Sequence, residues 1–308
     1  MEIRVIGRGA LAGLIAGFVG FLFAWIFAEP TIDKAIDYES GRMNVLSTVH
    51  TAMGHPVEPD GPELFSRSIQ SGVGAATGII AFSVAMGALV AVAYLVLHGR
   101  FGVRPKMLGW TVAGFGFLGV YLLPFVKYPS NPPAIGHEFT METRGFLYLG
   151  MVWGSLTLLG LAVFVARRLS GKVGWGRAVG IAVVGFFVVY GGLLAALPSL
   201  GDLSANVEHS GDFGFARAAT ETPQPITNTF STPVTVDGKV YAPGQLIYPG
   251  FDADLLWKFR WYSLIDQALI WAVLGLVFGW LVERYVGGHY SSSRTDTERL
   301  QHAGCHDK

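Results

Sequence analysis

The sequence predicts an all-α fold, a polytopic membrane helix bundle of about six spans with a mostly irregular outer loop. Hydrophobic residues make up 51% of the 308-residue chain and charged residues only 14%. A soluble domain of this composition would expose more apolar surface than it could bury. Six apolar stretches are also long enough to cross a bilayer as helices. We place the spans near 9–28, 73–97, 107–126, 145–165, 178–197 and 262–282.

The first span raises one alternative, a cleaved signal peptide, because it lies at the start of the chain behind basic residues. Its apolar run is too long, and no small-x-small pattern ends it, so we expect it to be retained. The membrane domain then covers 1–290, with outer loops 29–72, 127–144 and 198–261. A polar tail, 291–308, is expected to be disordered and cytoplasmic.

Orientation follows from the basic residues, since short cytoplasmic segments retain Lys and Arg. Such residues precede the first span and crowd the connections between spans two and three and between spans four and five. We therefore expect both termini in the cytoplasm of a multi-pass protein. The basic residues that carry this prediction are Arg4, Arg8, Arg100, Arg104, Lys106, Arg167, Arg168, Lys172 and Arg177.

The outer loop after span one begins with carboxylates at helical spacing. Glu29 precedes a proline, which suits the first turn of a helix, and Asp33 and Asp37 follow at i, i+4 spacing. Carboxylates on one face at a membrane mouth can coordinate a divalent cation. They can equally form a solvated helix face, and both interpretations stay open.

Histidines add candidate metal ligands to the outer loops. His50 and His55 follow in the first loop, and His137 and Glu138 lie in the second. Imidazole nitrogen with carboxylate oxygen suits first-row transition metals. The alternative is ordinary surface histidine in a flexible stretch.

A proline-rich exit follows span three and reads Lys-Tyr-Pro-Ser-Asn-Pro-Pro at 127–133. The prolines stiffen the backbone there. The segment either forms the wall of a pathway or stops the helix and anchors it at the interface. The pathway or structural residues are Lys127, Tyr128, Asn131, Pro132 and Pro133.

The last span holds an ionisable carboxylate, Asp266, about one turn inside its outer end. A charge in lipid is costly, so such a residue predicts a functional site that faces the bundle. The alternative is a pairing with Arg260. In the long outer loop before this span, 233–241 is centred on Asp237-Gly238 and predicts a β-hairpin.

Five motifs along the chain occur together: Glu-Pro-x-Ile-Asp at 29–33, Phe65-Ser66-Arg67, Gln70-x-Gly72-x-Gly74, the 127–133 motif and Leu-Leu-Trp-Lys-Phe-Arg at 255–260. In these motifs the chain resembles the CbtA family of predicted cobalt transporter subunits. The resemblance implies a bacterial cytoplasmic (inner) membrane protein that takes up cobalt. It also implies a partner, a small single-span histidine-bearing subunit of the CbtB type. The family is usually described with about five spans, one fewer than the sequence predicts here.

Enzymatic chemistry has no support in the sequence, which contains no P-loop, no Gly-x-Ser-x-Gly and no His-Glu-x-x-His pattern. One cysteine, Cys305, excludes an internal disulfide framework. We expect no permanently bound cofactor and no nucleic-acid partner. The leading hypothesis is a membrane subunit of a divalent metal transporter, with cobalt or another divalent metal as the transported ion. The alternative is a non-transporting membrane scaffold that stabilises a partner, and a homo-oligomer stays open.

Overall fold

The computed structural model describes residues 2–54 and 66–303, with side chains described as far as Val286. Six of its helical stretches are long and apolar enough to cross a membrane, which confirms the predicted all-α membrane bundle. The candidate spans are Glu2–Ala52, Arg67–Leu97, Pro105–Lys127, Glu138–Val173, Trp175–Gly211 and Ala253–Val286.

The helices in chain order are α1 (Glu2–Phe23), η1 (Ala24–Ala28), α2 (Glu29–Ala52), α3 (Arg67–Ile69), η2 (Gln70–Gly74), α4 (Ala75–Leu97), α5 (Pro105–Gly116), η3 (Phe117–Leu122), α6 (Leu123–Lys127), η4 (Glu138–Thr140), α7 (Met141–Val173), α8 (Trp175–Ala196), η5 (Leu200–Asp202), α9 (Ser204–Glu208), η6 (His209–Gly211) and α10 (Ala253–Ala303). The strands are β1 (Ile226–Thr227), β2 (Val234–Val236), β3 (Lys239–Tyr241) and β4 (Leu246–Tyr248).

The chain forms two compact units. Unit 1 contains Met1–Phe23, Ile69–Phe117 and Asp266–Lys308, and unit 2 contains Ala24–Ser68 and Leu118–Ile265. The segments η1, η2 and η3 are π-helical, and each begins within two residues of a boundary between the units. A π-helical turn widens the helix and is frequent at functional sites.

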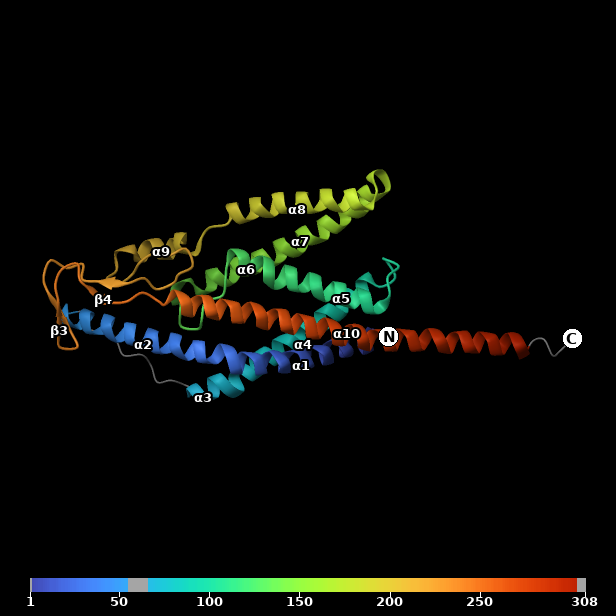
Figure 1. Ribbon diagram of the computed structural model, residues 1–308, viewed down its shortest axis with the longest axis horizontal. Coiled ribbons are helices and arrows are strands. Elements are labelled where there is room, and N and C mark those ends of the chain that lie inside the picture. The colour runs from blue at the N-terminus through green and yellow to red at the C-terminus, as the bar shows by residue number, and fades with distance from the viewer. Residues whose placement is uncertain (1, 55–65, 304–308) are drawn as a thin grey trace. The chain divides into compact units, whose positions relative to one another are not determined.

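Unit 1 is held together by the contact of α1 with α4 (Figure 1). Small residues at four-residue spacing meet there, because a Cβ on Gly9 would overlap the Gly87 carbonyl and a Cβ on Gly13 would overlap the Ser83 carbonyl. Such close backbone contact suits lipid, where packing replaces the hydrophobic effect as the force between helices. Gly87 takes part from the α4 side, because a Cβ there would overlap the Gly9 carbonyl.

A second contact of unit 1 joins α10 to α5. A Cβ on Gly275 would lie 2.9 Å from the Ala113 Cβ, and one on Gly279 would lie 2.7 Å from the Trp110 ring. Gly275 and Gly279 lie four residues apart on α10, and both positions face α5. At Gly78, by contrast, a Cβ would meet nothing within 4 Å. Spacing alone does not tell which glycines pack.

Unit 2 contains the paired helices α7 and α8 and the two small antiparallel sheets (Figure 1). Strands β2 and β3 form the predicted hairpin, with Val236 opposite Lys239. Asp237 and Gly238 have φ values of 47° and 75°, the left-handed conformation that this tight turn requires. A second pair, β1 with β4, is not predicted by the sequence.

The strands of unit 2 pack against α2 of the same unit. Val45 and Val49 of α2 share a buried cluster with Ile226, Val236 and Ile247. Next to this cluster the Tyr248 hydroxyl donates to the Tyr38 carbonyl, and burial raises the pKa of Tyr248. These contacts explain why the segment that starts at Glu29 is a long helix and not an irregular loop.

The C-terminal helix also extends further than expected. The sequence predicts a disordered tail from Ser291, and α10 continues to Ala303. Helix is compatible with this stretch because 289–303 contains neither glycine nor proline.

Candidate functional site

The predicted carboxylates at the start of α2 are joined by an arginine. Arg67 of α3 makes ion pairs with Glu29 and with Asp33, and its Nη2 donates to Asp33 Oδ1 at 2.9 Å. Glu29 is mostly buried, with 15% of its side chain exposed, whereas Asp33 is 56% exposed. Asp37, one turn further on, is exposed. The cluster thus carries one net negative charge, and a cation that enters it competes with the guanidinium.

The proline-rich exit makes structural contacts within unit 2. The Lys127 ammonium donates to the carbonyls of Leu194 and Leu197, both at 2.8 Å, and so caps the C-terminal end of α8. The buried Tyr128 donates its hydroxyl to the Pro198 carbonyl at 3.0 Å. These contacts favour the structural alternative for both residues.

Asn131 links three segments of the same unit. Its Nδ2 donates to the Thr220 carbonyl at 2.7 Å, and its Oδ1 accepts from Arg260 Nη2 at 2.9 Å. Arg260 also donates to the Ser130 carbonyl. Next to Asn131 in the sequence, Pro132 is buried and Pro133 is exposed in a turn. The guanidinium that the sequence offers to Asp266 is therefore engaged with this loop.

His137 belongs to a buried polar network that the sequence does not predict. At its centre Glu221, with none of its side chain exposed, accepts from the Thr140 hydroxyl at 2.9 Å and from Asn206 Nδ2 at 2.8 Å. Arg144 Nε lies 3.4 Å from the same carboxylate. Glu221 also has a left-handed backbone, with a φ of 55°. No local pattern marks this residue, because its partners come from segments far apart in the chain.

The network fixes the proton on the His137 ring. Asn206 gives both amide hydrogens away, to the Leu200 carbonyl and to Glu221, so its Oδ1 faces His137 Nδ1 at 2.6 Å. That oxygen only accepts, hence Nδ1 carries the proton and donates it. In the neutral ring Nε2 then holds a free lone pair, which is the arrangement of metal-binding histidines.

A second histidine near His137, His209, also donates its Nδ1 proton to an oxygen acceptor. Its Nδ1 donates to Asp212 Oδ2 at 2.7 Å. Both imidazoles stack on Phe139, with ring centroids at 4.0 Å for His209 and 5.1 Å for His137. Two imidazoles therefore share one aromatic ring in unit 2.

The remaining predicted ligands do not join a larger group. His50 of α2 packs edge-on against Phe213, Glu138 is exposed, and His55 lies outside the described residues. Across residues 2–54 and 66–286, no three His, Cys, Asp or Glu side chains are placed to hold one metal ion. Metal binding by the outer residues stays a prediction.

Asp266 is the buried carboxylate of unit 1. It lies on α10 with 9% of its surface exposed, and its Oδ1 has no hydrogen-bond partner among the described residues. It faces α1, because a Cβ on Gly20 would lie 3.2 Å from Oδ1. The sequence prediction that this residue faces the bundle is consistent with that position.

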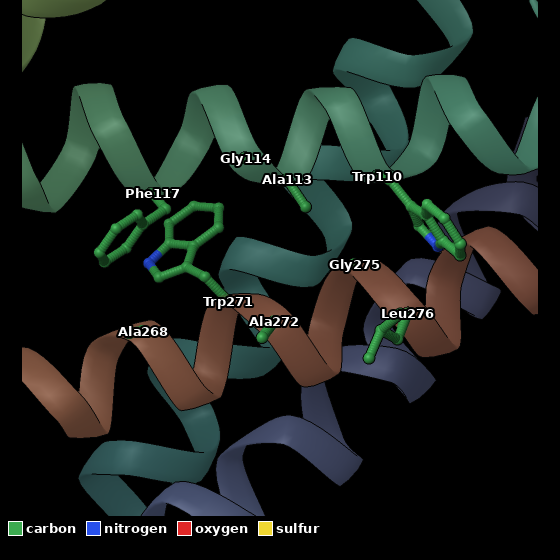
Figure 2. A pocket seen from close by; sticks show the side chains of 9 residues that line it. All are labelled: Trp110, Ala113, Gly114, Phe117, Ala268, Trp271, Ala272, Gly275 and Leu276. Atoms are coloured by element: carbon green, nitrogen blue, oxygen red, sulfur yellow. The ribbon is translucent and has the colours of Figure 1, made fainter.

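Unit 1 also contains an apolar pocket of about 400 Å³ between α5 and α10. Figure 2 shows the Phe117 and Trp271 rings at one end, Trp110 at the other and the small Ala113 and Gly275 between them. The full lining is Trp110, Ala113, Gly114, Phe117, Ala268, Trp271, Ala272, Gly275 and Leu276. No lining side chain supplies an oxygen or imidazole ligand, so this pocket suits an apolar group and not a cation.

Six membrane-length helices and a buried intramembrane carboxylate define the chain as a multi-pass membrane protein. The profile of one family, described as probable cobalt transporter subunit (CbtA), matches residues 2–283. The chain therefore belongs to the CbtA family, whose description as a transporter subunit implies a partner or complex. Searches of curated proteins and of solved structures gave no match.

Proposed function

We propose that this chain is the membrane subunit of a divalent metal uptake transporter, with cobalt as the transported ion and Asp266 as its ligand inside the membrane. The observation that carries the proposal is the buried Oδ1 of Asp266, which has no hydrogen-bond partner among the described residues. A carboxylate in a low-dielectric interior is costly unless it binds a proton or a cation. The family's description as a probable cobalt transporter subunit supports cobalt as the proposed cation.

The outer residues support a collecting role in this proposal. Glu29 and Asp33 hold a net negative charge beside Arg67, and in the neutral His137 ring Nε2 is the nitrogen with the free lone pair. An acidic surface concentrates cations near the mouth of a pathway. Arg67 would then act as a built-in competitor that keeps the carboxylates paired until an ion replaces it.

The setting proposed for this subunit is the bacterial cytoplasmic membrane with both termini inside. The basic residues of the short connections support that orientation. A small single-span, histidine-bearing subunit is the proposed partner, since a family of transporter subunits implies a complex.

Uptake of labelled cobalt by cells or proteoliposomes tests the role of Asp266. Asp266→Asn keeps the size and removes the charge, so it should abolish uptake at parental membrane abundance, while Asp266→Glu should retain part of it. Asp254→Asn is the matched control, because Asp254 is an exposed carboxylate on the same helix. Parental uptake by Asp266→Asn would exclude the residue from the pathway.

A scaffold is the second candidate function, and the contacts of Lys127 and Asn131 favour it because both serve to hold segments of unit 2 together. A scaffold predicts the opposite mutational pattern. Asp266→Asn would be tolerated. Gly279→Leu would be harmful, because even an added Cβ at this position would lie 2.7 Å from the Trp110 ring.

A further inference from the structure

Unit 1 contains a second buried oxygen without a partner, the hydroxyl of Ser83 on α4. The residue is fully buried, and its Oγ makes no hydrogen bond with any described residue. Hydroxyls in helices commonly donate back to a carbonyl three or four residues earlier. Thr111 and Thr48 do so at 2.8 Å. Ser83 leaves its hydroxyl free within the helix interface.

Ser83 and Asp266 face the same short segment of α1. A Cβ on Gly17 would lie 3.1 Å from Ser83 Oγ, and a Cβ on Gly20 would lie 3.2 Å from Asp266 Oδ1. Residues three apart on a helix lie on one face, with Cβ positions about 5–6 Å from each other. Two unpartnered oxygens from different helices thus approach α1 at positions 17 and 20, where the helix has glycine and no side chain.

We propose that Ser83 Oγ and Asp266 Oδ1 belong to one oxygen-donor site for a divalent cation in the α1–α4–α10 core. This inference rests on the proposed function, because it adds a ligand to the carboxylate already assigned to the pathway. An ion there satisfies both oxygens, and the low dielectric strengthens its attraction to the carboxylate.

The donor set predicts the chemical class of the ion. Carboxylate, hydroxyl and water are hard ligands and suit ions such as Mg²⁺ and Mn²⁺ as well as Co²⁺. This membrane site therefore accepts several hard divalent ions and contributes little preference for cobalt. Any preference for softer metals has to come from imidazole groups such as those of His137 and His209.

The test measures metal binding to the full chain in lipid nanodiscs, with Co²⁺, Mn²⁺ and Cd²⁺ as separate probes. Ser83→Ala should weaken Co²⁺ binding roughly 10-fold or more, the loss expected when a metal site loses a supporting group. Ser155→Ala is the matched control, because Ser155 is equally buried, its Oγ is equally without a partner, and it lies on α7 in unit 2. This control should bind Co²⁺ like the parent.

A softer ligand at the same position gives a readout that a packing role would not change. Ser83→Cys should raise the affinity for Cd²⁺ relative to Mn²⁺ several-fold, since thiolate prefers soft metals. Ser155→Cys should leave that ratio unchanged.

The outcomes separate this inference from the proposed function. If Ser83→Ala and Ser83→Cys bind metals like their Ser155 counterparts while Asp266→Asn stops uptake, Ser83 is no ligand and the proposed function stands. If Asp266→Asn also binds and transports cobalt like the parent, both fail. Weakened binding by Ser83→Ala with an altered metal ratio for Ser83→Cys supports the site.

Discussion

Replacing Glu221 should loosen unit 2 around residues 200–221. The Glu221 carboxylate contacts His137, Thr140, Arg144 and Asn206, which come from separate parts of this unit. Glu221→Gln keeps the shape but removes the charge beside Arg144 and turns one acceptor oxygen into an amide donor. That donor would face either Asn206 Nδ2 or the His137 backbone N–H, which now donate to Glu221 Oε1 and Oε2 and cannot accept. The variant thus combines a lost ion pair with a clash between two donors.

The magnitude follows from the burial of these groups. Removing one partner of a buried ion pair costs about 3–5 kcal/mol. Arg144 is 25% exposed and can be partly rehydrated, so we expect the lower end, about 3 kcal/mol. A change of this size speeds local opening by roughly 100-fold.

Hydrogen exchange of the backbone amides in 200–221 measures that local opening. Glu221→Gln should exchange about 100-fold faster there than the parent. Glu138→Gln is the control, since this neighbouring carboxylate is exposed and surface changes stay within about 0.5 kcal/mol. Equal exchange rates for the two variants would refute the argument that the buried network carries this stability.

Two further predictions compare matched positions. Gly87→Ala should lower the free energy of unfolding in detergent by about 1–3 kcal/mol, because the added Cβ overlaps α1. Gly78→Ala should be neutral or stabilising, because a Cβ there meets nothing within 4 Å. Equal melting curves for the two variants would contradict the assigned helix contact. Asp33→Ala should reduce cobalt uptake at parental membrane abundance, because Asp33 belongs to the ion-pair cluster of Arg67. Asp37→Ala should not, because Asp37 is an exposed residue one turn away. Normal uptake by Asp33→Ala would remove Asp33 from the collecting role.

Sequence reasoning reached the parts of this protein that depend on local pattern. Apolar length placed the six spans, since a helix must satisfy its own backbone groups in lipid. The Asp237-Gly238 turn located the hairpin because few residue pairs adopt left-handed conformations easily. Proline after Glu29 marked the start of α2. Asp266 stood out as a carboxylate within an apolar run.

Partners far apart in the chain were decided only by the tertiary structure. Arg67 joins Glu29 and Asp33, which lie 38 and 34 residues earlier in the chain, and Glu221 meets Thr140, 81 residues earlier. Ser83 has no distinguishing neighbours in the sequence, and only the packing of α4 against the glycines of α1 leaves its hydroxyl buried without a partner. Periodicity and hydropathy describe how one segment meets lipid or water, whereas burial and hydrogen bonding depend on which other segments the fold brings into contact.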